Sequence, residues 1–308
     1  MNLKARSSVS YELLYIVGII AISFSSIFIR WSSAEVSVVG MYRLYLTNLL
    51  LLPLVWKHRK EMFSLKLKQW CGLLLSGAML GLHFLLWMSS LRLTTVASST
   101  VILTLEPILV MFGSFFLFGA KINRPMLAGM ALALIGSVAI GSGDFKLSGT
   151  ALQGDLLSLL GTVAVAAHML IGKRLLGTMT AFVYNFWVFA SAGTLLAVYN
   201  AVRGYDFTGY APKEWGIFLL LAVVPTLFGH YLFNWLMKFI SASAVSMAVL
   251  GEPVFSSLLA WILLKEKLTG LQMIAGIVIL CGVWIFIRYG KEIPATETKV
   301  NATLKESA

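Results

Sequence analysis

Two glutamate–proline pairs lie at matching positions inside long apolar stretches of this sequence. Glu106-Pro107 and Glu252-Pro253 are separated by 146 positions. A carboxyl inside an apolar membrane helix is energetically costly, and the proline that follows removes one backbone hydrogen bond from that helix. Interrupted helices at equivalent points of a duplicated membrane chain are the usual sequence pointer to a transport pathway. We therefore predict that both glutamates line a substrate pathway and that both prolines mark helix breaks or gating points.

The two carboxyls allow two interpretations. An isolated carboxyl in a low-dielectric interior favours its protonated form, so Glu106 and Glu252 are candidate proton carriers that exchange a proton for a cationic group of the substrate. Alternatively, each glutamate ties its interrupted helix to a neighbouring helix, because proline leaves a backbone carbonyl in need of a partner. The sequence leaves both interpretations open.

Two histidines follow the same duplication. His83 in LGLHFLLW matches His230 in FGHYLFNW at a shift of 147 positions. Trp87 and Asn234 each lie one helical turn beyond their histidine, so each pair shares a helix face. Histidine titrates near neutral pH and relays protons or binds substrates, although in a membrane helix it also serves as a hydrogen-bond link to another helix. We predict these four side chains and Tyr231 as pathway residues.

Arg43 is the only cation expected well inside a membrane span. An arginine at this depth needs an acid, freed carbonyls or a water-filled cavity as its partner. Glu106 is one candidate partner, and a substrate carboxylate is another. Pro225 is expected to kink the helix beside His230 and to act as a hinge.

The composition is that of a membrane protein. Apolar residues make up 59% of the 308 positions and charged residues only 12%, whereas a soluble domain has about 25% charged residues. The apolar runs have roughly the 20 residues that a helix needs to cross a bilayer, and they lack the alternation of a transmembrane barrel. We predict an all-α polytopic membrane protein with ten transmembrane helices, at residues 11–31, 36–56, 69–91, 95–118, 125–142, 154–172, 180–202, 214–237, 243–264 and 268–287.

The excess of basic residues is a topology signal. The chain carries 24 Lys and Arg against 13 Asp and Glu, a net charge of +11. With the N-terminus inside the cell, the cytoplasmic segments hold more than twice as many cations as the outer segments. This asymmetry predicts a multi-pass protein of the cell (plasma or inner) membrane with both termini in the cytoplasm, and it argues against nucleic-acid binding.

The ten spans divide into two repeats. Arg92 matches Lys238 and Gly136 matches Gly282 at the same shift of 146 positions. Each repeat has five spans, so the second enters the membrane from the opposite side and a pseudo-two-fold axis in the membrane plane relates the halves. The predicted organisation is a cytoplasmic N-terminus (1–10), a first repeat (11–142), an inter-repeat loop (143–153), a second repeat (154–288) and a disordered cytoplasmic tail (289–308).

Small residues mark the last helix of each repeat for close packing. Gly129 and Gly136 in the first repeat, and Ala275 and Gly282 in the second, let helix backbones approach each other. Packing within the chain is the favoured interpretation and a dimer face is the alternative. A monomer and a homodimer both remain open.

Several segments resemble the EamA-type family of the drug/metabolite transporter superfamily. They are RLYLTNLLLLPL and LEPILVMFGSFFLFGAKINRPMLAGMALALIG in the first repeat and GEPVFSSLLAWILLKEKLTGLQMIAGIVILCGVWI in the second. Arg43 matches the family's arginine in its second helix. Pro253, Glu266 and Gly282 fit its pattern of a proline, an acidic turn and a last helix that carries glycine. The resemblance implies two inverted halves of five helices each.

The resemblance leaves the substrate open. Family members move amino acids, other metabolites or toxic compounds, often outward. This chain departs from the family in that Ala120 stands where an acidic turn residue follows the fourth span. The tryptophan-containing motif of the first and sixth helices is replaced by SFSSIFIRW and VAVAAHMLIGKR. Because those helices line the family's central cavity, no particular substrate follows from the resemblance.

Three function classes are consistent with these features. The favoured one is a secondary-active transporter of small amino-acid-like or drug-like metabolites, an exporter that works by alternating access around a central cavity, with protons as an optional coupling ion. No GxxxxGK[ST] loop is present to bind a nucleotide. The alternatives are a membrane channel or scaffold and, less favoured, a lipid-modifying enzyme, whose chemistry needs clustered acids and histidines.

No cofactor or metal is expected. Cys71 and Cys281 both fall within predicted spans, form neither a disulfide framework nor a metal-ligand pattern, and are interpreted as small core residues. The expected partners are a small-molecule substrate, the lipid bilayer and coupling protons.

Overall fold

The computed structural model describes residues 11–94, 96–141, 149–265 and 269–289. Within these ranges the chain folds into helices without any β-strand. The predicted N-terminal segment, most of the predicted inter-repeat loop and the tail beyond Tyr289 lie outside the described residues, as does Glu266.

The first repeat forms six helices, because its fourth span is interrupted. These are α1 (Tyr11–Trp31), α2 (Val36–Phe63), α3 (Leu67–Leu93), α4 (Val96–Leu103), α5 (Glu106–Phe118) and α6 (Arg124–Gly141). Helix α2 continues past its predicted end at Trp56. The added segment, KHRKEMF, consists mainly of Lys, Arg, Glu and Met, which all favour helix in water.

The second repeat is interrupted in two spans. Its elements are α7 (Gly149–Leu176), α8 (Ala181–Arg203), α9 (Pro212–Leu221), the π-helix η1 (Ala222–Tyr231), α10 (Leu232–Leu236), α11 (Ala242–Ser246), the 3-10 helix η2 (Met247–Gly251), α12 (Glu252–Leu264) and α13 (Gly270–Tyr289). The fourth, eighth and ninth predicted spans, which contain Pro107, Pro225 and Pro253, are thus each divided among several helical elements. Helix α7 also begins at Gly149, inside the segment predicted as a loop.

The predicted fold class is confirmed by the lengths and composition of these helices. Among the described residues, nine helical segments are long and apolar enough to cross a membrane, and Arg124–Ile140 is a shorter apolar helix. Large apolar side chains such as Phe116, Val202 and Ile277 are exposed on the outside of the bundle. A surface of this kind suits lipid, in which apolar side chains face the acyl chains.

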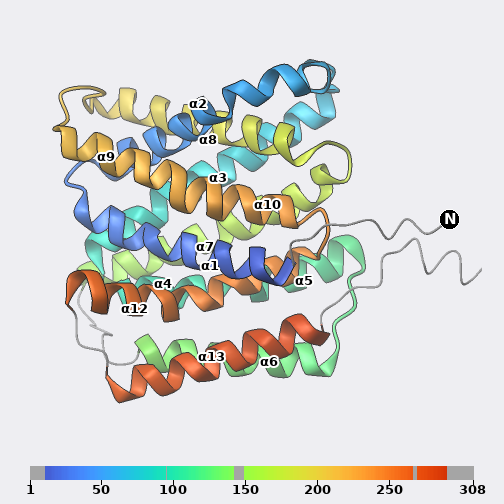
Figure 1. The fold of residues 1–308 in the computed structure, drawn as a ribbon, viewed down its shortest axis with the longest axis vertical. Coiled ribbons are helices and arrows are strands. Elements are labelled where there is room, and N and C mark those ends of the chain that lie inside the picture. The colour runs from blue at the N-terminus through green and yellow to red at the C-terminus, as the bar shows by residue number, and fades with distance from the viewer. Residues whose placement is uncertain (1–10, 95, 142–148, 266–268, 290–308) are drawn as a thin grey trace, which may run out of the picture.

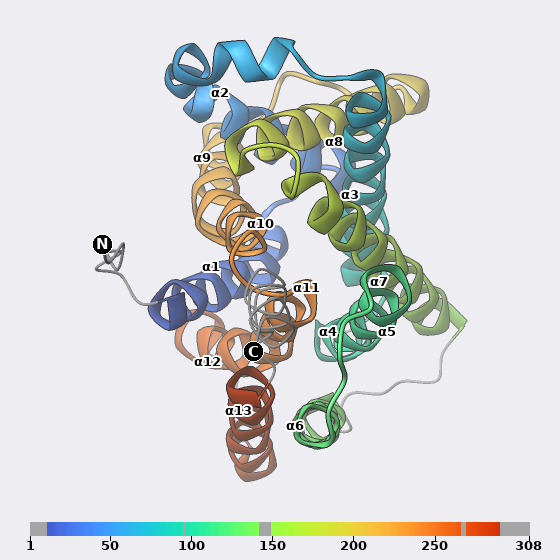
Figure 2. The same cartoon turned by 90° about the vertical axis from the view of Figure 1, so that its right-hand side faces the viewer.

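The first helix of each repeat packs against the other repeat. Helix α1 contacts α9, η1, α10 and α12, and helix α7 contacts α3, α4 and α5. Figure 1 shows these helices stacked in layers. Figure 2 shows them nearly end-on, with α1, α9, α10 and α12 on one side and α3, α4, α5 and α7 on the other. We call these two groups the α1 side and the α7 side.

Helices α6 and α13 form a separate layer at one edge of the bundle (Figures 1 and 2). Their backbones are in contact. A Cβ placed on Gly282 would lie 2.5 Å from the carbonyl oxygen of Gly129, and one placed on Gly136 would lie 2.8 Å from that of Ala275. The small residues of these helices are thus used for packing within the chain.

The two cysteines do not lie in the core. Both Cys71 and Cys281 are exposed, which corrects their interpretation as core residues. Cysteine is a small apolar residue that lipid accepts as readily as protein does, so its type does not tell which of the two surrounds it.

Candidate functional site

Each glutamate of the repeated Glu-Pro pairs is the first residue of a helix. Helix α4 ends at Leu103, a turn follows, and α5 begins at Glu106. Helix α11 passes into the 3-10 helix η2, and α12 begins at Glu252. The carboxyls therefore stand at helix breaks within their spans, where the partial positive charge of a helix N-terminus favours an anion.

The proline after each glutamate accounts for the position of the break. The missing N–H of Pro253 would have bonded the carbonyl of Val249. That carbonyl instead accepts from the backbone N–H of Glu252, one residue earlier, which produces the tighter 3-10 turn. Pro107 stands likewise in the first turn of α5, where its absent N–H costs nothing to the helix that follows.

Both glutamates line one small cavity between the α1 side and the α7 side. The cavity volume is about 60 Å³, enough for a few water molecules at roughly 15 Å³ each. His83 and Trp87 of α3 and His230 of η1 line the same cavity. The two repeats thus bring residues far apart in sequence to one central site.

The two carboxyls have no fixed partner. Among the described residues, neither Glu106 nor Glu252 forms a side-chain hydrogen bond or an ion pair. They interact electrostatically with each other, and Glu252 also interacts with Arg43. The interpretation of these glutamates as hydrogen-bonded ties between helices therefore finds no contact to support it.

His83 is held in a defined orientation. Its Nδ1 lies 3.0 Å from the carbonyl oxygen of Gly161, and its ring lies parallel to that of Trp87 with 5.9 Å between centroids. With Nδ1 donating to that carbonyl, Nε2 is an acceptor for a group in the cavity. The indole Nε1 of Trp87 is buried and has no hydrogen-bond partner among the described residues.

Arg43 lies one layer behind the cavity. It is fully buried, donates from Nε to Thr226 Oγ1 (2.9 Å) and from Nη1 to Ser25 Oγ (3.2 Å), and stacks on Phe84 at 4.3 Å. Nη2 has no partner among the described residues. Arg43 does not contact Glu106, its candidate partner from sequence. Ser25, which does line the cavity, connects it to the site.

Pro225, the expected kink and hinge position, lies inside the π-helix η1. Pro225 has no N–H to bond the carbonyl of Leu221, and the hydroxyl of Thr226 bonds it instead (2.8 Å). The same hydroxyl accepts from Arg43. π-Helical turns occur frequently at functional sites, and here the wider turn joins a proline, a hydroxyl and a buried guanidinium.

Replacing Thr226 with Val should lower the stability of the protein. The isosteric change leaves the Leu221 carbonyl and Arg43 Nε without this partner, at a cost of about 2 kcal/mol in the free energy of unfolding. Thermal denaturation in detergent should show a lower Tm. Thr194→Val serves as the control, because Thr194 is exposed and its hydroxyl bonds that of Tyr45 alone among the residues that the structure describes. Equal Tm values for the two variants would contradict the role of Thr226.

Of the predicted pathway residues Asn234 and Tyr231, the structure places only Asn234 at the cavity. Asn234 lines the cavity, and its Nδ2 donates to Asn185 Oδ1 (2.8 Å). Tyr231 is half-buried and does not line the cavity; its carbonyl oxygen accepts a long bond from Asn185. Tyr231 follows His230 directly, and neighbouring residues on a helix point about 100° apart, so only one of the two faces the centre.

His168 is the cavity residue that sequence comparison of the repeats missed. It is buried on α7, lines the cavity, and bonds the hydroxyl of Ser76 through Nδ1 (2.9 Å). His168 has no histidine counterpart in the first repeat, so duplication did not single it out. The available signal was its place in the segment VAVAAHMLIGKR, in the sixth helix, which the family resemblance assigns to the cavity wall.

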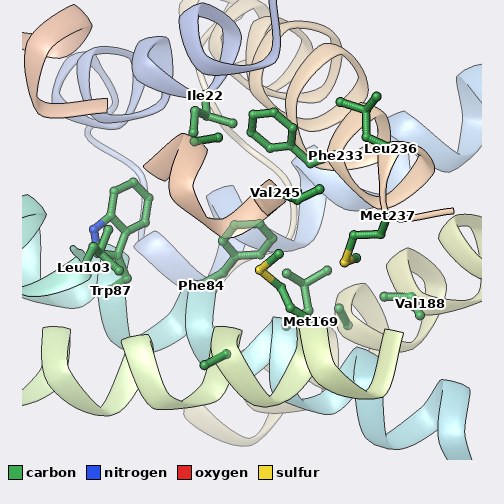
Figure 3. Close-up of a cluster of buried hydrophobic side chains, with 14 of the residues drawn as sticks. Ile22, Phe84, Trp87, Leu103, Met169, Val188, Phe233, Leu236, Met237 and Val245 are labelled. Atoms are coloured by element: carbon green, nitrogen blue, oxygen red, sulfur yellow. The ribbon is translucent and has the colours of Figure 1, made fainter. Parts of the chain in front are cut away.

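Apolar side chains make up the rest of the cavity wall. Ile22, Leu103, Met169 and Phe233 line it together with the polar residues. Figure 3 shows Trp87 and Leu103 together at one end of this cluster, apart from Phe233. Among the described residues, no group of three or more His, Cys, Asp or Glu side chains is placed to hold a metal ion.

The sequence profile of the EamA-like transporter family matches this chain twice, at residues 9–142 and 152–288. An uncharacterized transporter of Bacillus subtilis, YetK, is 24% identical over 251 residues, which cover 78% of this chain and 73% of that protein. An uncharacterized transporter of Archaeoglobus fulgidus is 28% identical over 196 residues, 62% of this chain and 67% of that one.

A solved crystal structure has the same fold. It superimposes with a TM-score of 0.75 at 18% sequence identity and covers 91% of this chain and 96% of its own. The similarity therefore extends across the whole helical bundle rather than a single repeat.

Proposed function

This chain belongs to the EamA-like transporter family and is a multi-pass membrane transporter, and from this premise we propose that it is a secondary-active exporter of small amino-acid-like or drug-like metabolites. Substrate would bind in the central cavity and reach each face of the membrane in turn. The observation that carries the proposal is that two glutamates, neither with a side-chain hydrogen bond or ion pair among the described residues, line one central cavity at two helix breaks.

The chemistry of the cavity favours a substrate with a cationic amine and an apolar body. Glu106 and Glu252 present carboxylate oxygens without fixed donors, which suits an ammonium group. The apolar wall suits an aliphatic or aromatic side chain. A substrate carboxylate would be attracted to Arg43, whose Nη2 is unpartnered among the described residues. An amino-acid-like compound satisfies all three requirements.

The cavity volume supports alternating access over a static channel or scaffold. A cavity of about 60 Å³ is far smaller than the roughly 300 Å³ of an ordinary ligand site. The helices must therefore separate before a metabolite enters. The interrupted spans are the elements in which a change of this kind needs the least loss of backbone hydrogen bonds.

Proton coupling is the mechanism proposed for the two glutamates. A carboxyl without a fixed hydrogen-bond partner can hold a proton when the site is empty and release it to take up an ammonium group.

We propose that the protein lies in the cell membrane with both termini in the cytoplasm, because of the distribution of its basic residues. We further propose that the chain is not an enzyme, since its relatives are transporters by name.

Flux into proteoliposomes tests this proposal. Purified protein in liposomes should transport at least one amino-acid-like compound from a labelled metabolite panel, and an imposed pH gradient should change the initial rate about tenfold, because one pH unit is a tenfold change in proton activity. Protein-free liposomes are the control. Flux that ignores the pH gradient would reject proton coupling, and no flux of any compound in the panel would count against the proposed substrate class.

A further inference from the structure

Arg92 and Lys238 hold matching places in the two repeats, at the ends of spans that line the cavity. Arg92 lies in the last turn of α3, and Lys238 follows α10. The repeats are inverted, so the two cations lie at opposite faces of the membrane, here named the Arg92 face and the Lys238 face. Neither residue lines the central cavity.

At the Arg92 face, the guanidinium joins the two sides of the bundle. Arg92 Nη2 donates to the carbonyl oxygens of Ser32 (3.0 Å) and Ala34 (3.2 Å), which directly follow α1. Arg92 belongs to α3 on the α7 side, whereas α1 belongs to the α1 side. The contact therefore spans the seam along which the cavity would open.

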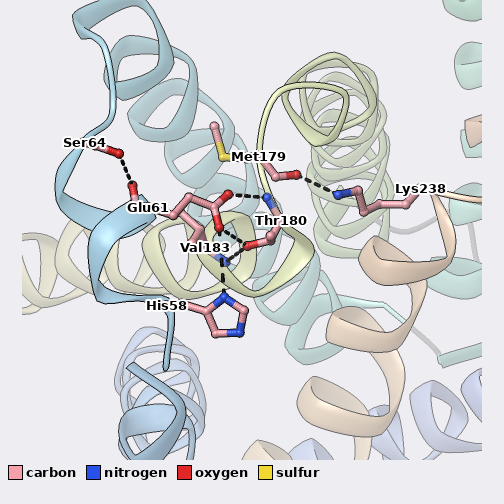
Figure 4. Close-up of polar contacts among 7 residues, drawn as sticks. All are labelled: His58, Glu61, Ser64, Met179, Thr180, Val183 and Lys238. Carbon is pink, nitrogen blue, oxygen red and sulfur yellow. Dashed lines mark hydrogen bonds and ion pairs between the residues drawn. The ribbon is translucent and has the colours of Figure 1, made fainter. Parts of the chain in front are cut away.

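At the Lys238 face, an ammonium group joins the same two sides. Lys238 Nζ donates to the carbonyl oxygen of Met179 (2.9 Å), as Figure 4 shows. Met179 follows α7 on one side, and Lys238 follows α10 on the other. Lys173 of α7 bonds in the opposite direction, to the carbonyl oxygens of Met237 (2.7 Å) and Ile240 (2.9 Å).

The two accepting loops are equivalent, because Ser32 and Met179 both follow the first helix of their repeat, 147 positions apart. A carboxylate from the other repeat holds each loop. Glu214 accepts from the backbone N–H of Ser33 (3.0 Å) and from the hydroxyl groups of Ser32 and Ser33 (2.5 and 2.9 Å).

Glu61 holds the second loop in the same manner. Its carboxylate accepts from the backbone N–H of Thr180 (2.6 Å) and from its hydroxyl group (2.8 Å), as Figure 4 shows. Each carbonyl that receives a cation thus belongs to a loop whose position is fixed by a carboxylate. A fixed acceptor makes the cation contact specific in geometry.

A recess in the protein surface lies beside Arg92. A surface recess of about 410 Å³ reaches Arg92 and is also lined by Ser33, Glu35 and Ser89. The central cavity, of about 60 Å³, is much smaller and is lined by other residues. The cation contacts at the two faces thus both bridge the α1 side and the α7 side.

We infer that Arg92 and Lys238 are paired gates, each of which holds one face of the transporter closed and releases when that face opens. The inference rests on the alternating access of the proposed function. A few partly exposed hydrogen bonds at each face are weak enough to break in every cycle. Because Arg92 and Lys238 hold equivalent places in the repeat, loss of either contact favours opening at its own face, and the two bonds of Lys173 remain at the Lys238 face.

Site-specific thiol labelling tests the two gates. Cys71 and Cys281 are replaced by Ala, and Val165, which lines the cavity, is replaced by Cys as the reporter. A membrane-impermeant maleimide is added to one face at a time, with membrane vesicles of known orientation. Arg92→Ala should raise the labelling rate from the Arg92 face about tenfold, and Lys238→Ala should do so only from the Lys238 face.

Two exposed arginines provide matched controls. Arg30→Ala in the last turn of α1 and Arg174→Ala near the end of α7 remove a cation close to each gate. Both should label as the parent does. Two results would overturn the gates: equal labelling rates for all variants from both faces, or a faster rate from the face opposite the substituted cation. If flux is present in proteoliposomes, either result leaves the transport proposal intact. A reporter that stays closed to both faces in every variant would overturn alternating access as well.

Discussion

The double variant Glu106→Gln and Glu252→Gln is expected to lose transport almost completely while folding normally. Glutamine keeps the volume of the side chain but removes the negative charge. A hydrogen bond to a charged group contributes about 1.5–3 kcal/mol, so each substitution should reduce flux about tenfold and the pair about 100-fold. The remaining flux should no longer respond to an imposed pH gradient, because glutamine does not carry a proton.

Folding and transport are measured separately for these variants. Thermal denaturation and size-exclusion chromatography in detergent should match the parent protein, since neither carboxyl has a hydrogen bond or ion pair among the described residues. Asp206→Asn is the charge-matched control, because Asp206 is exposed and lines neither the central cavity nor the recess at Arg92. Parent-like flux from the double variant across the pH range would reject the proton-carrier role.

Gly282→Leu is expected to give the largest loss of stability. A Cβ at this position would lie 2.5 Å from the carbonyl oxygen of Gly129 and 2.6 Å from the backbone nitrogen of Ala133. These are backbone atoms of α6 that cannot rotate away, so α6 and α13 must separate. Overpacking of a tight interface costs about 3 kcal/mol, and the Tm in detergent should fall accordingly. Gly129→Leu should act in the same way.

A glycine without neighbours separates this effect from the general cost of the substitution. Gly216 lies within α9 and has no atom within 4 Å of its Cβ position. Gly216→Leu should therefore leave the Tm close to that of the parent, or raise it slightly because leucine favours helix. A Tm for Gly282→Leu equal to that of Gly216→Leu would show that the α6–α13 contact does not limit stability.

Much of the architecture can be read from the sequence. Apolar runs long enough to span a bilayer predict the helices, and the repeated Glu-Pro pairs predict two inverted halves. Both are confirmed by the fold and the family. The sequence is informative here because a lipid environment admits few alternatives: every backbone polar group must be bonded within a helix, so hydropathy alone locates the spans.

Local helix geometry was harder to predict. A proline within a span predicts that the helix is interrupted, but it does not predict the geometry of the interruption. The chain has a turn before Glu106, a 3-10 helix before Glu252 and a π-helix around Pro225. The outcome depends on which group bonds the freed carbonyl. At Leu221 this is the hydroxyl of Thr226, which in turn receives Arg43 from another helix.

Which side chains face each other across the cavity was decided only by the tertiary structure. The sequence pairs Glu106 with Glu252 and Arg92 with Lys238 by duplication, and it singles out Arg43 by its charge. It does not reveal that the first helix of each repeat packs on the other repeat, which brings His168 to the cavity and turns Tyr231 away from it. Hydropathy records only that a residue avoids water. Whether lipid, a neighbouring helix or a cavity replaces the water depends on how the helices pack, and no local pattern of residues encodes that.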